Sequence, residues 1–443
     1  MKIVRSALIG AVSVFALSTA GEATAQVTPE QEAALGAVAK LFRATVDIGS
    51  GAGAFSDSFG FNDQSDARDF LQDSELRARY GSRYTGVEAV RGVLDFRGVP
   101  IIGSYDAGST SFRVTVPAAD QPGAPGEPYT RVFTGPTREA SYQAFKDFFD
   151  EDIEDDEAEY LIRALLRALA GQSAVDPLAG NPDSLQGALV RSAMDLSEGG
   201  SAIEGGAESA ADDPWMVGIA YTRAESDRFT TDRISGRLQR SFRVFEGGRA
   251  LLKLEAPFSY LQTSKARTGT VALGAGLEVP LLQGRWSLEP KVSIGATASE
   301  LASAGWMASA SVSSRFRIDN IGRGYLLIGN MVGYTTTLPA KIGSEMDLNP
   351  HLENWVFRNG LAYELPLKGQ VLGRGGSVRA SYTFTNFTGD DLYLEKFHEV
   401  TLSLGVRNRE GVAKTVHDLI RVNTAATFGE DYQAYTVGIG YRF

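Results

Sequence analysis

Runs of alternating apolar and polar residues fill the C-terminal half of the chain. Strict alternation places the apolar side chains of a strand on one face and the polar side chains on the other. In one such run, Leu273 and Val279 share a parity, and Gly274 and Glu278 share the opposite one. The pattern predicts strands at 215–227, 230–244, 249–263, 268–282, 285–298, 305–319, 324–338, 352–367, 375–388, 393–408, 418–430 and 433–443.

The chemistry of the two faces favours a membrane barrel over a soluble β-sandwich. A sandwich buries its apolar faces and keeps its charges outside, whereas a membrane barrel turns apolar residues to lipid and polar residues to its lumen. Each run is long enough for the about 9–11 residues that a tilted membrane strand needs. We therefore predict an all-β transmembrane antiparallel barrel of about 12 strands over 215–443. Aromatic residues near the run ends suit interfacial girdles, namely Trp215, Trp286, Trp306, Trp355, Tyr363, Tyr382 and Tyr441.

The final strand is expected to pair with the first, because closure removes the exposed sheet edges. An even strand count then places both barrel ends on one side, the periplasm. The apolar parity of this closing strand consists of Tyr435, Val437, Ile439, Tyr441 and Phe443.

Three polar residues, Arg240, Asn330 and Asn359, fall on the apolar parity. A basic side chain at the bilayer midplane costs about 2–4 kcal/mol. We expect a bulge or a position near the rim for these residues, and a pairing of the two asparagines on neighbouring strands.

The N-terminal half lacks the strand alternation and predicts a small mixed α+β domain over 26–196. Expected helices cover 27–45, 64–80, 137–170 and 183–198, and strands lie within 84–117. Residues 118–128 (AADQPGAPGEP) are expected to form a loop. The Gly/Ala/Ser-rich, acidic stretch 197–214 is expected to be a flexible linker.

The first 25 residues have the pattern of a secretory signal peptide. Lys2 and Arg5 precede an apolar segment, and Ala23 and Ala25 form a small-x-small cleavage site. Together with the barrel pattern, this predicts the outer membrane of a Gram-negative bacterium, with the N-terminal domain in the periplasm. Outer-membrane lipid, lipopolysaccharide and the barrel-assembly machinery are the expected partners.

Charge differs between the two halves. Residues 27–213 carry 32 acidic and 15 basic side chains, whereas residues 214–443 carry 21 acidic and 26 basic ones. Such asymmetry predicts two domains with different surroundings. The basic residues show no pattern typical of nucleic-acid binding. The chain has no cysteine, which excludes disulfides and thiolate metal sites.

The lumen parity is predominantly basic. It could fill the barrel with cross-strand ion pairs, favour anionic solutes in a pore, or attract the acidic N-terminal half or its linker as a plug. The predicted charged lumen residues are Arg237, Arg243, Lys253, Glu255, Glu278, Glu289, Lys291, Arg315, Arg317, Arg358, Glu364, Arg379, Glu399, Arg407 and Arg421.

Motifs for catalysis, metals or cofactors are lacking, and we predict no enzyme, no cofactor and no metal. The acidic run 150–159 lacks the spacing and the glycine of a calcium loop. Some outer-membrane phospholipases are 12-stranded barrels with a histidine and a serine facing lipid. Here only His398 lies on a lipid-facing parity, and no serine pattern accompanies it.

Over 215–443 the layout resembles the autotransporter-type translocator barrel, with about 12 strands, a preceding helix and linker, and an aromatic C-terminus. The closing strand also resembles the sorting signature of outer-membrane barrels, which implies recognition by the assembly machinery. The resemblance implies that residues 183–198 thread the pore. The N-terminal part departs from this family, because it is short and lacks the repeated rungs of typical passengers.

Three functions remain open: a channel or structural barrel that the acidic N-terminal domain plugs or gates, an autotransporter-like translocator that displays residues 27–196, and an outer-membrane lipid-modifying enzyme.

Overall fold

The computed structural model divides into two compact units, residues 1–173 with 339–350 and residues 174–338 with 351–443. It describes residues 41–62, 64–150, 156–197, 215–227, 229–244, 250–264, 266–300, 303–339, 341–342, 346–347, 349–371, 374–407 and 418–442. The predicted signal peptide with Ala23 and Ala25, linker residues 198–214 and Phe443 lie outside the described residues. No helix in the described ranges is long and apolar enough to cross a membrane.

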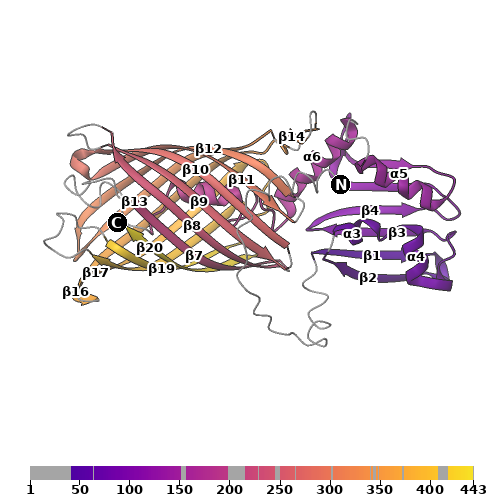
Figure 1. The fold of residues 1–443 in the computed structure, drawn as a ribbon, viewed down its shortest axis with the longest axis horizontal. Coiled ribbons are helices and arrows are strands. Elements are labelled where there is room, and N and C mark those ends of the chain that lie inside the picture. The colour runs from indigo at the N-terminus through magenta and orange to yellow at the C-terminus, as the bar shows by residue number, and fades with distance from the viewer. Residues whose placement is uncertain are drawn as a thin grey trace. The chain divides into compact units, whose positions relative to one another are not determined.

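The first unit is a six-stranded antiparallel sheet in the order β2-β1-β3-β4-β5-β6, accompanied by helices (Figure 1). Its core joins Val46 and Phe112 of the sheet to Leu76, Phe145 and Leu161 of the helices. The strands are β1 (Phe42–Ile48), β2 (Phe55–Phe61), β3 (Val90–Phe96), β4 (Val99–Tyr105), β5 (Phe112–Gln121) and β6 (Ala124–Phe133). The helices are α3 (Gln64–Asp69), α4 (Asp73–Tyr80), α5 (Arg138–Asp150) and α6 (Asp156–Gln172).

Two expectations for this unit were wrong. Residues 42–45 of the predicted helix 27–45 belong to strand β1, where FRATVDI alternates and buries Phe42, Ala44, Val46 and Ile48. Residues 27–40 lie outside the described residues. The predicted loop 118–128 belongs largely to the β5–β6 hairpin. Its prolines are tolerated because β6 is an edge strand, where a missing N–H breaks no ladder on the open side. In addition, the expected helix 64–80 is divided into α3 and α4.

A buried arginine ties two loops of this unit to helix α5. The Arg138 guanidinium donates to the carbonyl oxygens of Glu88 at 2.7 Å, Ser109 at 2.9 Å and Asp106 at 3.1 Å. It also donates to the Tyr84 hydroxyl at 3.2 Å. Arg138 therefore holds these loops in place by donating hydrogen bonds to backbone carbonyl groups that have no strand partner there.

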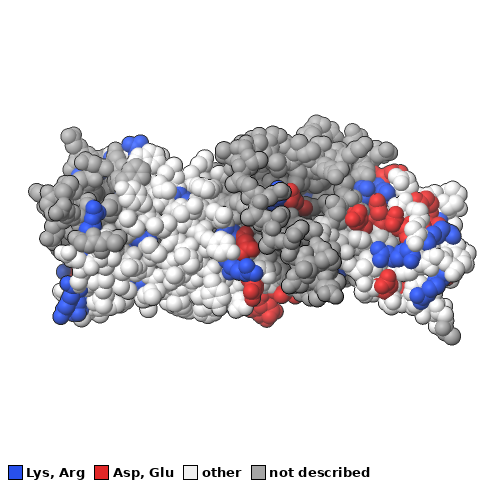
Figure 2. All heavy atoms as spheres, turned by 60° about the horizontal axis from the view of Figure 1, so that its bottom comes forward, with Lys and Arg blue, Asp and Glu red and all other residues white. Residues whose placement is uncertain are grey.

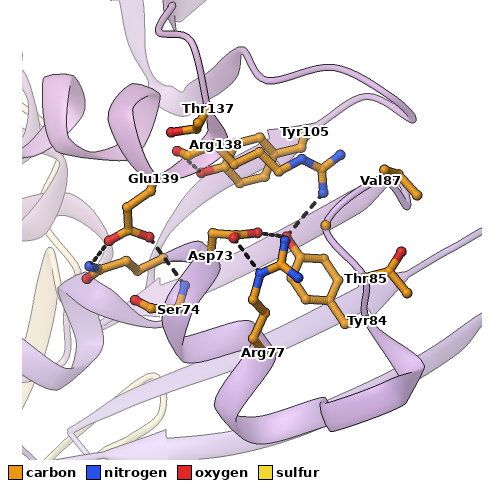
Figure 3. Close-up of polar contacts among 12 residues, drawn as sticks. Asp73, Ser74, Arg77, Tyr84, Thr85, Val87, Tyr105, Thr137, Arg138 and Glu139 are labelled. Carbon is orange, nitrogen blue, oxygen red and sulfur yellow. Dashed lines mark hydrogen bonds and ion pairs between the residues drawn. The ribbon is translucent and has the colours of Figure 1, made fainter.

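The network continues from Tyr84 to helix α4 (Figure 3). The Tyr84 hydroxyl donates to the Asp73 carboxylate at 2.7 Å, and Arg77 donates to its other oxygen at 2.7 Å. Burial raises the pKa of Tyr84 to about 12. The hydroxyl thus keeps its proton and can accept from Arg138 while it donates to Asp73.

We expect acid to weaken this part of the first unit through Glu88. Partial burial raises the pKa of its carboxyl, but hydrogen bonds from the Thr85 hydroxyl and from backbone N–H groups outweigh this and lower the pKa to about 2. Because the folded pKa lies below the ordinary value of 4.5, the stabilisation is complete above about pH 4.5 and is lost as the pH falls towards 2.

Pepsin digestion of the complete protein between pH 4.5 and 2, read by mass spectrometry over residues 84–109, measures this loss. Glu88→Gln should flatten the pH dependence of cleavage, whereas Glu127→Gln, at an exposed position, should leave it unchanged. Equal profiles for the wild type and Glu88→Gln would contradict the assignment.

The second unit is a closed barrel of twelve antiparallel strands, which confirms the predicted fold class (Figure 1). Strand β20 pairs with β7 from Tyr432 opposite Ser226 to Arg442 opposite Met216, so no edge remains. The strands are β7 (Trp215–Ser226), β8 (Phe229–Arg243), β9 (Leu251–Thr263), β10 (Ala266–Leu281), β11 (Trp286–Ser299), β12 (Ser303–Ile321), β13 (Gly324–Leu338), β16 (Glu353–Val371), β17 (Arg374–Gly389), β18 (Lys396–Arg407), β19 (Asp418–Gly429) and β20 (Tyr432–Arg442). Short strands β14 (Lys341–Ile342) and β15 (Met346–Asp347) pair in the connection from β13 to β16.

The barrel wall is apolar outside and polar inside. Leu273 and Val292 keep 61% and 60% of their surface exposed, whereas Glu278 and Lys291 on the opposite parity are buried. Figure 2 shows a broad band of the barrel almost without charged groups, with charges at its margins. On the closing strand, the exposed outward side chains are Tyr435, Val437, Ile439 and Tyr441.

The polar residues on the outer face occupy two kinds of position. Asn330 and Asn359 are opposite each other in the β13–β16 register, as expected for a pair on neighbouring strands. The Arg240 guanidinium lies 5.0 Å from the ring centre of Trp215 and 4.7 Å from that of Phe242. Cation–π contacts of this kind suit an arginine near an aromatic girdle.

Candidate functional site

Residues 174–197 occupy the barrel lumen and contain helix α7 (Leu185–Ala193), drawn in magenta inside the barrel in Figure 1. Leu185, Leu189 and Met194 are fully buried. Ser184 caps the helix, because its hydroxyl accepts from the Gly187 N–H at 3.2 Å. These residues belong to the barrel unit, whereas the sequence placed a domain boundary at 196. The difference arises because their contacts are with the inner wall.

The segment begins at the end of the barrel where the β7–β8 hairpin lies. The Ser226 hydroxyl, at the end of β7, donates to the Ala174 carbonyl at 3.5 Å. The Leu394 N–H, in the connection from β17 to β18, donates to the Gly180 carbonyl at 2.9 Å. Both contacts lie at the end opposite to the start of β7 and the end of β20.

The segment then runs towards the end that holds the barrel termini. Arg379, near the start of β17, donates to the Leu196 carbonyl at 3.1 Å. Arg358 donates to the Met194 carbonyl at 3.0 Å. Carbonyl groups after a helix have no intrahelical partner, and these two arginines satisfy them. The chain thus crosses the lumen from the hairpin end towards the terminal end.

Buried polar contacts hold the start of the segment. The Asp183 carboxylate lies 3.1 Å from the Arg233 guanidinium and accepts from the Tyr432 hydroxyl at 2.8 Å. The Gln186 amide donates to Thr335 and Asn354, at 3.0 Å each. Removing one partner of such a buried network leaves the other partner without its hydrogen bond. These contacts therefore fix the position of the segment in the lumen.

Further anchors lie beyond the helix centre. The Lys291 ammonium donates to the Ser192 carbonyl at 2.6 Å, and Arg237 lies 3.2 Å from the Asp195 carboxylate. Residues 174–197 carry three acidic side chains and one basic one. An acidic segment therefore sits in a basic lumen, whereas the acidic linker lies outside the described residues.

Helix α7 packs against one side of the lumen, formed by β10 to β13. A Cβ atom at Gly295 would lie 2.6 Å from Leu185 Cδ1, and one at Gly305 would lie 3.1 Å from Leu178 Cδ1. Glycine at these wall positions therefore provides the space that the segment fills. On the opposite side a cavity of about 210 Å³ remains.

Most of the predicted lumen charges are buried and joined in ion pairs. Lys253 contacts Glu278 at 2.7 Å and Glu289 at 2.9 Å. Glu364 contacts Arg379 at 2.5 Å and Arg421 at 3.0 Å. The remaining pairs are Arg315 with Glu289, Lys291 with Glu255, and Arg358 with Glu399.

Three predicted lumen residues are not among these buried ion pairs. Arg243 is exposed at the end of β8. Arg317 is partly exposed and pairs with Asp319 at 2.7 Å. The side chain of Arg407 lies outside the described residues. Near the end of a strand both faces contact water, so the parity of a residue no longer separates lumen-facing from lipid-facing side chains.

Sequence reasoning missed several residues that hold the segment in the lumen, on the wall and on the segment itself. Arg233 shares the parity of Arg237 and could have been included on that ground. No local sequence pattern indicated the contacts of Asp183, Gln186 and Asp195, because their partners lie far away in the sequence.

His398 lies in an aromatic cluster on the outer face. Its ring nitrogen lies 2.8 Å from the Tyr382 hydroxyl, and its ring stacks on Phe428 with a centroid distance of 5.3 Å. Phe384 completes the cluster. Among the described contacts of His398, none involves a serine hydroxyl.

The sequence matches no known protein-family model and no curated protein. Its fold is similar to the β domain of the Bordetella autotransporter BrkA, at 12% identity over 52% of this chain and 98% of that chain, with a TM-score of 0.38. The translocator domain of NalP from Neisseria meningitidis matches at 14% identity over 52% and 88%, with a TM-score of 0.39. An outer-membrane channel from Pseudomonas putida matches at 10% identity over 54% and 98%, with a TM-score of 0.34.

Proposed function

We propose that the protein is an outer-membrane barrel that carries its N-terminal unit at the cell surface and closes its own lumen with residues 174–197. The apolar outer wall and polar inner wall support the membrane part of the proposal. Outer-membrane lipid with lipopolysaccharide would surround the wall, and the barrel-assembly machinery would recognise β20.

The direction of residues 174–197 is the observation that carries surface display. The barrel termini face the periplasm if the barrel inserts from that side, since the strand number is even. Ala174 contacts Ser226 at the opposite end, which then faces the outside. The chain that precedes Ala174 would therefore leave the barrel on the outer side. This proposal replaces the periplasmic location expected from sequence.

The cavity beside α7 favours a second function, a channel that residues 174–197 gate. The lumen would conduct if the segment withdrew, since the opposite wall is not in contact with the helix along the cavity. In this case the ion pairs of Asp183 and Asp195 would hold the closed state.

Protease treatment of intact cells tests the display proposal. We expect added protease to cleave residues 41–173 in intact cells while the barrel, detected by an antibody to residues 215–443, persists. A periplasmic marker protein must stay intact as the control. Protection of residues 41–173 until the outer membrane is permeabilised would refute surface display and leave the gated channel.

A further inference from the structure

The open half of the lumen has the composition of an anion site. Its cavity of about 210 Å³ lies between α7 and the inner wall of β7 to β10 and β16 to β20. The volume exceeds the about 30 Å³ share of one water molecule several times over, so a small solute fits with water around it. The charged lining residues are Arg191, Asp195, Arg233, Arg237, Arg358 and Glu399.

Three of the four arginines have carboxylate partners. These pairs are Arg233 with Asp183 at 3.1 Å, Arg237 with Asp195 at 3.2 Å, and Arg358 with Glu399 at 2.5 Å. The cluster therefore keeps one positive charge without a matching carboxylate.

That charge belongs to Arg191, in the last turn of α7. Within the described part of the chain, its side chain lines the cavity and makes no hydrogen bond or ion pair. The Nε of the buried Arg233 has no hydrogen-bond partner either. A guanidinium has five donors, so the half-buried Arg191 can offer several of them to a ligand in the cavity.

Neutral donors surround the same cavity. Residues with hydroxyl or amide side chains belong to its lining, among them Thr383, Thr401, Thr436 and Asn423. Oxyanions suit such a set, because the planar guanidinium fork matches two oxygens and hydroxyls can donate to a third. A cation would instead meet the excess positive charge.

We propose that this cavity binds a small oxyanion, a phosphate or a carboxylate, with Arg191 as the principal contact. The site exists whether or not the N-terminal unit is displayed, because all its residues belong to the barrel unit. A bound anion would contact both α7 and the opposite wall of the lumen, which the helix itself does not reach.

Calorimetric titration of the complete mature protein in detergent tests the proposal, with sodium phosphate and sodium acetate as separate probes at constant ionic strength. We expect saturable binding of at least one probe with one site per chain, and the preferred probe identifies the oxyanion. Arg191→Gln should weaken binding about tenfold or more. Arg191→Lys keeps the charge and should weaken it less.

Arg240→Gln, on the outer face, is the matched control and should bind as the wild type does. Unchanged affinity in Arg191→Gln, or no saturable binding of either anion by the wild type, would overturn the proposal. If Arg191→Gln does not fold, Arg191→Lys against Arg240→Gln decides the same question.

Discussion

Barrels of residues 215–443 alone should conduct ions in planar bilayers, whereas the complete mature protein should remain closed or nearly so. In the complete chain, residues 174–197 fill the half of the lumen beside β10 to β13 and bind both ends of the inner wall. Their removal leaves a polar lumen with more basic than acidic side chains, so we expect anion preference. Single-channel conductance and reversal potential in a salt gradient measure both effects.

A point substitution tests the same mechanism without truncation. Valine at Gly295 would collide with the buried Leu185 side chain, and overpacking of this kind costs about 1–3 kcal/mol. Gly295→Val in the complete chain should therefore show opening events that the wild type lacks. Gly269→Val is the matched control, since a Cβ atom there meets nothing within 4 Å.

Two results would contradict this account of closure. Equal conductance of the complete protein and the 215–443 barrel would mean that residues 174–197 do not block ions. A silent 215–443 barrel would mean that the wall side chains alone fill the lumen, which would remove the gated channel as a function.

Replacing Glu364 should destabilise the barrel more than any other single change considered. This buried carboxylate contacts two buried arginines, Arg379 at 2.5 Å and Arg421 at 3.0 Å. Glu364→Gln leaves two guanidinium charges without a counterion, and breaking a buried pair in this way costs about 3–5 kcal/mol. Arg379 also holds the Leu196 carbonyl, so the lumen segment should loosen as well.

Urea unfolding in detergent or lipid, followed by tryptophan fluorescence, measures this loss. All four tryptophans, Trp215, Trp286, Trp306 and Trp355, lie in barrel strands, so the signal reports the barrel alone. Glu395→Gln, at an exposed position, should change the unfolding free energy by no more than about 0.5 kcal/mol. A Glu364→Gln barrel as stable as the wild type would show that the pair of arginines is compensated by water.

Two sequence predictions failed in the first unit. Residues 42–48 alternate as a strand does and pair with β2 and β3, but the predicted helix 27–45 extended into their first residues. The Pro- and Gly-rich stretch 118–128 reads as a loop, yet the ladder to β5 holds part of it in edge strand β6. In this hairpin the partner strand, which no local window contains, overrode propensity.

The barrel itself could be predicted because its signal is local. A strand between lipid and a polar lumen must alternate residue by residue, so each run by itself indicates a membrane strand. The predicted and observed strands agree closely, and most of the charged residues predicted for the lumen are buried. The helical pattern at 183–198 likewise predicts α7.

The occupancy and direction of the lumen segment could not be read from local pattern. They depend on contacts such as Gln186 with Asn354, which lie 168 positions apart, and on glycines that matter only because a helix packs on them. The resemblance implied threading, but only the closed barrel brought Ala174 to the hairpin end and left Arg191 facing a cavity. Each strand alternates because one of its faces contacts lipid and the other faces the polar lumen. The filling of the lumen depends instead on the shape and charge of all twelve strands together.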